Sequence, residues 1–167
     1  SERKNPEAVV EFARRIDEKF VIAGRGWEEI VPRRLARDNV ELRGYVSEDQ
    51  LIDLYQGASV FYFPTHHEGF GLPVLEAMAA ETAVVTSDVY AVPEVTGDAA
   101  VLCDPDDVDT HLSHIERLLA NDDERRALAC RATERARSFT WSEAAEKTEQ
   151  VYRELVSAEQ IETTTPR

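Results

Sequence analysis

Two glutamates and two glycines occur together in the stretch EGFGLPVLE at residues 68–76. Seven residues separate Glu68 from Glu76, and Pro73 lies between them. A carboxylate can accept two hydrogen bonds from adjacent hydroxyl groups, as in the ribose sites of nucleotide-binding α/β folds. The spacing therefore predicts that Glu76 holds a ribose and that Glu68 reaches a different hydroxylated part of the same molecule.

A phosphate is expected between the two acids. Pro73 favours a helix start, because its fixed φ is helical and its missing N–H would have no partner there. Gly69 and Gly71 let the backbone approach a ligand closely, and free N–H groups at Phe70, Gly71 and Leu72 would face an anion with the helix dipole behind them. The alternative is a plain turn with two solvated glutamates, but so many matching features in one window favour a ligand site.

Strands that alternate with helices are predicted to carry this stretch. Short apolar runs predict strands at residues 20–24, 40–46, 60–63, 83–86 and 99–103. Helical spacing predicts helices at 5–18, 28–37, 47–57 and 72–80, and residues 106–157 are almost wholly helical in pattern. Asn5 is a predicted N-cap, and capping boxes are predicted at Ser47–Gln50 and Thr140–Glu143. This order is typical of a doubly wound, Rossmann-like α/β fold, a parallel sheet with helices on both faces. We expect one domain over 1–167 with a frayed tail at 162–167.

Composition narrows the function classes. The net charge of -14 disfavours binding to nucleic acid or anionic lipid through a general field. Arginine far outnumbers lysine among the 19 basic residues, a pattern of proteins adapted to high salt, although an ordinary acidic protein fits equally well. No apolar run is long enough to span a bilayer. Cys103 and Cys130 lie in apolar contexts, which predicts reduced core thiols and a cytoplasmic location.

The four histidines are candidate ligands. Neighbouring His66 and His67 point apart on an extended backbone, so we expect His67 to contact sugar or phosphate and His66 to be scaffold. His111 and His114 are three residues apart on a predicted helix, but no third metal ligand is evident, and surface positions are expected for both. The acidic run at 104–109 lacks residues that an EF-hand needs and is interpreted as a helix-capping turn. No metal site is predicted.

Beyond these features, the sequence resembles a known family. The motif E-G-F-G-L-P-x-L-E-A-M-A, preceded by F-Y-F-P and followed by A-V-V-T-S-D-x-x-x-x-P-E-V, is similar to the C-terminal domain of the group 1 retaining glycosyltransferases. These glycogen synthase-like enzymes have GT-B architecture, in which two Rossmann-type domains face each other. The similarity extends over nearly the whole chain, from K-N-P-E near the start to F-T-W near the end.

The resemblance implies roles for individual residues. The sugar-facing acid and catalytic residue would be Glu68, and Glu76 would bind the ribose of a UDP-, GDP- or ADP-sugar. Gly69 and the amides of Phe70, Gly71 and Leu72 would hold the sugar and diphosphate, Lys4 would neutralise the diphosphate, and the base would pack near Tyr45 and Val46. No metal is required, because amides and a lysine stabilise the leaving diphosphate. The acceptor, and any membrane contact, would belong to an N-terminal domain outside this chain, so the chain alone is expected to be inactive.

Two departures from the family pattern are evident. The family has a glycine and a proline after the motif helix, where this chain has Ala80-Glu81-Thr82-Ala83. We expect an altered turn or an exposed Glu81. The family's central strand would also precede Ser1, which predicts a gap between the strand at 20–24 and the strand at 60–63.

Two other functions stay open. One is a binding module that has lost catalysis, although both motif glutamates are present. The other is a nicotinamide-dependent oxidoreductase, but the segment Gly24-Arg25-Gly26-Trp27 does not continue to the third glycine of that motif.

Overall fold

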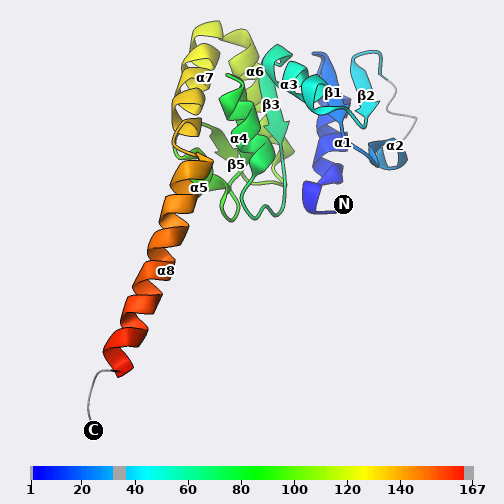
Figure 1. Cartoon of the computed structure of the whole chain (residues 1–167). Coiled ribbons are helices and arrows are strands. Elements are labelled where there is room, and N and C mark those ends of the chain that lie inside the picture. Colours follow the sequence, from blue (N-terminus) through cyan, green and yellow to red (C-terminus); the bar gives the residue numbers. More distant parts are fainter. Residues whose placement is uncertain (1, 32–36, 164–167) are drawn as a thin grey trace. The chain divides into compact units, whose positions relative to one another are not determined.

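The structure is a computed structural model that describes residues 2–31 and 37–163. The chain divides into two units, residues 1–136 and residues 137–167. The first unit contains, in order, η1 (Glu2–Lys4), α1 (Pro6–Arg15), β1 (Phe20–Ala23), α2 (Trp27–Ile30), β2 (Val40–Gly44), α3 (Glu48–Gly57), β3 (Val60–Phe63), α4 (Leu72–Ala79), β4 (Ala83–Ser87), α5 (Val92–Thr96), β5 (Val101–Cys103), α6 (Val108–Ala120) and α7 (Asp122–Ala136) (Figure 1).

All strand pairs of the first unit are parallel, but the strands form two sheets. One sheet has the order β1-β2 and the other the order β3-β4-β5. In the described part of the chain, β1 and β3 are not hydrogen-bonded to each other, as expected from the gap between residues 20–24 and 60–63. The predicted parallel α/β architecture is confirmed.

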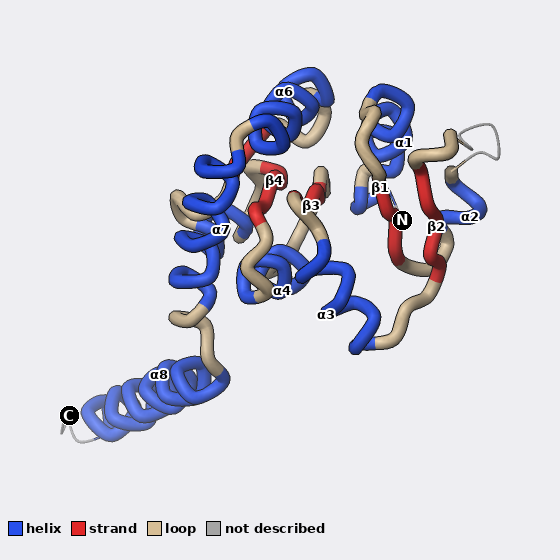
Figure 2. The backbone as a smooth tube through the Cα atoms, turned by 90° about the horizontal axis from the view of Figure 1, so that it is seen from above, coloured by secondary structure: helices blue, strands red, loops and turns tan. Residues whose placement is uncertain are grey.

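Successive residues of β4 face opposite sides of its sheet. Ala83 and Val85 pack in a core with helices α1 and α6, whereas Val84 packs in a second core with α3, α4 and α7. Figure 2 shows α6 on one side of β3 and β4, and α3 and α4 on the other. All three residues are almost completely buried, as expected for a strand covered on both faces.

Helix α1 connects the cores of the two sheets. Its Val9 and Ala13 pack with β1 and Trp27, while Phe12 and Ile16 pack with the three-stranded sheet. The Phe12 ring lies 5.2 Å from Phe20 of β1 and 4.4 Å from Tyr62 of β3, measured between centroids. Aromatic side chains therefore pack between β1 and β3, which do not pair with each other in the described part of the chain.

The predicted capping signals form as expected. The Asn5 side chain accepts a hydrogen bond from the Ala8 N–H, with Pro6 in the first turn of α1. Ser47 and Gln50 form both hydrogen bonds of a capping box at the start of α3. Glu81 has a left-handed φ of 63° and is exposed, which confirms its expected exposure in the turn after α4.

The predictions for one helix and for one cysteine of the first unit are wrong in part. The helix expected at 28–37 ends at Ile30, and Val31 is extended. Val31 precedes Pro32, and a proline disfavours the helical conformation of the residue before it. Residues 32–36 lie outside the described part of the chain. Cys130 is exposed on α7, since Leu128 and Ala132 take the buried face of that helix.

His111 is also not on the surface. It is fully buried on α6, on the same face as Ile115, and its Nδ1 lies 2.8 Å from the Tyr62 hydroxyl. Burial lowers the pKa of His111. The expectation of a surface histidine therefore failed because the helix is turned so that this position faces β3.

The second unit contains helix α8 (Trp141–Thr163). The Thr140 hydroxyl accepts a hydrogen bond from the Glu143 N–H at 3.1 Å, which is one of the two hydrogen bonds of the capping box predicted there. Large apolar side chains on α8 are exposed, among them Trp141, Tyr152 and Leu155. Residues 162 and 163 belong to α8, and the rest of the expected tail lies outside the described residues.

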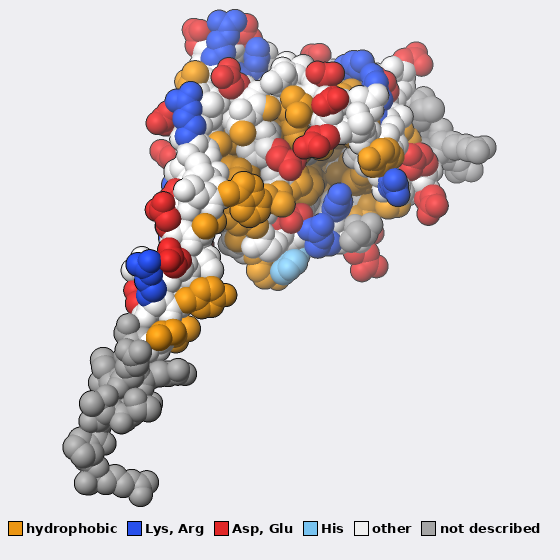
Figure 3. Space-filling model, viewed as in Figure 1, with side chains coloured by type: hydrophobic (Ala, Val, Ile, Leu, Met, Phe, Trp, Pro, Cys, Tyr) orange, Lys and Arg blue, Asp and Glu red, His pale blue; other side chains and the backbone are white. Residues whose placement is uncertain are grey.

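Acidic and basic side chains are interspersed over the face shown in Figure 3. Within the described residues, no helix is long and apolar enough to cross a membrane.

Candidate functional site

The loop between β3 and α4 contains the glutamate motif. The strand ends at Phe63, and α4 begins at Leu72 after Gly71, which has a left-handed φ of 92°. Pro73 lies in the first turn, and the Val74 N–H donates to the Gly71 carbonyl at 2.9 Å. A bulky residue at Gly71 would be strained at this φ. The predicted strand, glycine turn and proline-started helix are therefore all present at the carboxyl end of β3.

The two motif glycines differ in their surroundings. A Cβ added at Gly71 would lie 3.7 Å from a methyl group of Val92, in the segment that follows β4. A Cβ at Gly69 would have no atom within 4 Å, so the space over this glycine is open. Gly71 is thus needed for its backbone conformation, whereas Gly69 leaves room for an approaching ligand.

Glu68 is covered by an arginine. The residue is only 8 % exposed, and its Oε1 forms an ion pair with Nη1 of Arg3. The same Nη1 donates to the His67 carbonyl at 3.0 Å. The carboxylate predicted to face a sugar is therefore already bound to a cation in the free chain.

Further hydrogen bonds fasten the loop to the start of the chain. The Arg3 carbonyl accepts from the Thr65 hydroxyl at 2.9 Å and from the His66 N–H at 2.9 Å. His66 Nε2 lies 2.7 Å from Asp106. This hydrogen bond raises the pKa of His66 and lowers the pKa of Asp106. His66 is thus part of the scaffold, as expected, and the Asp107 side chain caps α6, as the acidic turn predicted.

Glu76 is held differently. It is exposed on α4, and its Oε2 accepts a hydrogen bond from the Tyr55 hydroxyl of α3 at 3.0 Å. Tyr55 is 7 % exposed, and burial, followed by the charge of Glu76, raises the pKa of its hydroxyl. A neutral phenol therefore orients one oxygen of Glu76 and leaves the other available to a ligand.

Three of the remaining predicted residues, Tyr45, Val46 and His67, lie after the ends of strands. Tyr45 and Val46 follow β2, and the Arg25 guanidinium lies 4.6 Å from the centroid of the Tyr45 ring. His67 contacts the ring of Tyr90, in the loop after β4, with centroids 4.2 Å apart. Lys4 ends η1, next to the arginine that binds Glu68.

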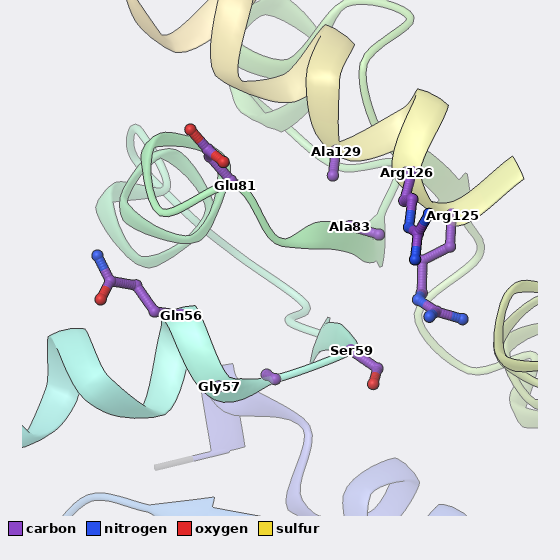
Figure 4. A pocket seen from close by; sticks show the side chains of 9 residues that line it. Gln56, Gly57, Ser59, Glu81, Ala83, Arg125, Arg126 and Ala129 are labelled. Carbon is purple, nitrogen blue, oxygen red and sulfur yellow. The ribbon is translucent and has the colours of Figure 1, made fainter. Parts of the chain in front are cut away.

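A pocket of about 280 Å³ opens at the opposite edge of the sheet (Figure 4). It is lined by Ser59 and Ala83, where β3 and β4 begin, and by Arg125 and Arg126 of α7. Arg125 already pairs with Asp122 at 2.7 Å. Because the glutamate motif follows the carboxyl ends of the strands, this pocket is separate from the candidate site.

No three histidine, cysteine, aspartate or glutamate side chains gather into a possible metal site in the parts of the chain that the structure describes. Residues that could stabilise an anion are instead the amides at the start of α4 and the cations Arg3 and Lys4.

The family of glycosyl transferases group 1 matches residues 1–135. The chain belongs to this family. It is 37% identical over 142 residues to O-antigen chain mannosyltransferase B of Escherichia coli, which covers 81% of this chain and 37% of the relative. It is 40% identical over 106 residues to D-inositol 3-phosphate glycosyltransferase of Corynebacterium diphtheriae, which covers 62% of this chain and 25% of the relative.

A solved structure agrees with these matches. Sucrose-phosphate synthase from Thermosynechococcus elongatus is 27% identical and has a TM-score of 0.82, covering 95% of this chain and 44% of that one. The chain thus spans less than half the length of each of these relatives. The predicted resemblance to group 1 glycosyltransferases and the GT-B type of fold are confirmed.

Sequence reasoning missed three residues around the motif. Arg3, Tyr55 and Tyr90 contact Glu68, Glu76 and His67, respectively. For Arg3, the sequence did offer an indication, because this residue is next to Lys4, which was predicted to bind the diphosphate. Nothing in the spacing of the two tyrosines indicates their partners.

Proposed function

We propose that this chain is the donor-binding domain of a retaining glycosyltransferase that transfers a hexose from a nucleoside-diphosphate sugar. The observation that carries the proposal is the β3–α4 loop, in which Gly71 and Pro73 start a helix and Glu76 is exposed one turn later. The names of two relatives, a mannosyltransferase and an inositol phosphate glycosyltransferase, support a sugar transfer, and the first favours mannose. The acceptor would be bound by a second domain, so the chain alone would not turn over.

The chemistry follows from where negative charge develops. When the bond from sugar to phosphate breaks, charge accumulates on the leaving diphosphate. The amides of Gly71 and Leu72, the dipole of α4 and the ammonium group of Lys4 would stabilise that charge where it forms, which requires no metal ion. Glu76 would hold the ribose hydroxyls with the oxygen that Tyr55 leaves available.

Glu68 would accept hydrogen bonds from hydroxyls of the transferred sugar. Its ion pair with Arg3 makes the arginine a second cation beside the expected diphosphate site. Arg3 would then share its N–H donors between Glu68 and the donor. The base would lie near Tyr45 and Val46.

Calorimetric titration of the chain with UDP, GDP, ADP and NAD tests the proposal. We expect one of the nucleoside diphosphates to bind. Glu76→Gln should weaken it by about tenfold or more, because a hydrogen bond to a charged group contributes roughly 1.5–3 kcal/mol. The glutamine oxygen can still accept from Tyr55, so folding is preserved.

Glu116→Gln is the matched control, since Glu116 is an exposed glutamate of α6. It should bind like the unmodified chain. The proposal fails if no nucleoside diphosphate binds or if Glu76→Gln has no effect, and preferential binding of NAD would favour an oxidoreductase instead.

A further inference from the structure

Tyr90 is an exposed aromatic residue at an unusual backbone conformation. It lies three residues after the end of β4, is 71% exposed, and has a φ of 49°. Bulky residues rarely adopt a positive φ, and such strained positions cluster at functional sites. A glycine would adopt this conformation with less strain, so the tyrosine ring is held here at a cost to the backbone.

The surroundings of Tyr90 place it beside the glutamate motif. Strands β3 and β4 are parallel and pair Phe63 with Thr86, so the loops that follow them leave the same edge of the sheet. The Tyr90 and His67 rings form an edge-to-face pair with an interplanar angle of 75°. His67 directly precedes Glu68 in the sequence.

A second contact joins the two loops. Val92 lies against Gly71, the residue that precedes α4. The segment from Tyr90 to Val92 therefore borders the motif loop both at His67 and at the start of the helix. The structure thus brings two exposed aromatic rings to the border of the predicted sugar site.

We propose that Tyr90, supported by His67, forms the surface on which the hexose of the donor stacks. This inference rests on the proposed function. A hexose has a rim of hydroxyls and faces made of C–H groups, and the negative face of an aromatic ring attracts such weakly positive hydrogens. Glu68 and the loop amides would bind the hydroxyls while the Tyr90 ring contacts a C–H face. Small-molecule sites commonly combine aromatic surfaces with a few polar groups in this way.

The stacking role predicts a selective loss of affinity. Calorimetry with GDP-mannose and UDP-glucose, each compared with its bare nucleoside diphosphate, measures the share of binding that comes from the sugar. Tyr90→Gly should weaken the sugar nucleotide that binds by about threefold to tenfold, which corresponds to one aromatic contact. Binding of the bare diphosphate should stay within about twofold. Tyr90→Phe, which keeps the ring, should restore the affinity for the sugar nucleotide.

Stability and controls exclude a merely structural effect. Tyr90→Gly relieves a positive φ, so its free energy of unfolding in urea should equal or exceed that of the unmodified chain. Tyr152→Ala is the control, because it removes an exposed tyrosine of α8 and should leave both affinities unchanged. Alanine is used at this position because a glycine would destabilise the helix.

The outcomes separate this inference from the proposed function. It is overturned if Tyr90→Gly binds the sugar nucleotide like the unmodified chain, or loses the bare diphosphate to the same extent. If Glu76→Gln abolishes binding while Tyr90→Gly is silent, only the stacking role falls. An unmodified chain that binds no nucleotide overturns both proposals.

Discussion

The two glutamates of one motif are held in opposite ways. Glu68 is almost buried and forms an ion pair with Arg3, which belongs to the start of the chain. Glu76 is exposed and accepts a hydrogen bond from the neutral hydroxyl of the buried Tyr55. A buried carboxylate needs a nearby cation, because moving an unpaired carboxylate out of water costs roughly several kcal/mol. An exposed carboxylate needs only a group that orients it.

This difference indicates how each acid would meet a ligand. In the proposed function, Glu76 would bind a hydroxyl pair without rearrangement of the protein. Glu68 would do so while its carboxylate is shared with Arg3. Of the two glutamates in this motif, Glu76 is thus exposed and Glu68 is covered. Their partners, Tyr55 and Arg3, are the residues at which this contrast can be tested.

The largest effect is expected from Arg3→Ala. It leaves the carboxylate of Glu68 without its cation, and the pair has side-chain exposures of 40% and 11%. That places it between an exposed pair and a buried one, so the free energy of unfolding should fall by about 2 kcal/mol in urea titrations.

Two further variants test the cause of that loss. Arg3→Ala combined with Glu68→Gln should be more stable than Arg3→Ala alone, because a neutral amide costs less to bury. Arg14→Ala removes an exposed pair with Glu11 and should cost less than about 0.5 kcal/mol. Equal effects of Arg3→Ala and Arg14→Ala would show that Glu68 does not depend on its cation.

A smaller effect is expected from Tyr55→Phe. It removes one hydrogen bond to Glu76, and the exposed carboxylate can turn to water, so the free energy of unfolding should fall by about 1 kcal/mol. Screening in about 1 M salt should shrink the effect of Arg3→Ala but leave that of Tyr55→Phe nearly unchanged. Urea titrations at low and high salt measure both, and an equal response to salt would contradict the contrast between an ion pair and a neutral donor.

The smallest effect concerns the pH dependence of the loop that carries Glu68. The raised pKa of His66 means that its pairing with Asp106 stabilises the fold fully below the ordinary value of 6.5, and that this stabilisation is lost as the pH rises through the raised pKa. The lowered pKa of Asp106 adds stability above 3.8, which is lost as the pH falls through the lowered pKa. The contribution should therefore be largest between these two values.

Urea titrations of His66→Gln and of the unmodified chain measure this window. The difference in free energy of unfolding should be greater at about pH 5 than at about pH 9. Adding Asp106→Asn to both proteins should remove most of the pH dependence of that difference. A difference that is the same at both pH values, with or without Asp106, would contradict the pairing.

Much of the local structure could be predicted from the sequence. The capping box of Ser47 and Gln50, the Pro73 helix start and the strand at Val60–Phe63 all form where they were expected. Each depends on backbone preferences and on hydrogen bonds between residues a few positions apart. The glutamate motif was recognisable for the same reason, since its chemistry lies in one loop and one helical turn.

Only the tertiary structure decided which side chains meet across the fold. Arg3 and Glu68 are 65 positions apart in the sequence, and Tyr55 and Glu76 are 21 apart. The burial of His111 and the exposure of Cys130 depend on how α6 and α7 are turned against the sheet. Residue types and spacing determined the turns, the strands and the position of the acids along the chain. Packing determined which acid is covered and which is exposed, because burial and pairing depend on distant segments that no local pattern specifies.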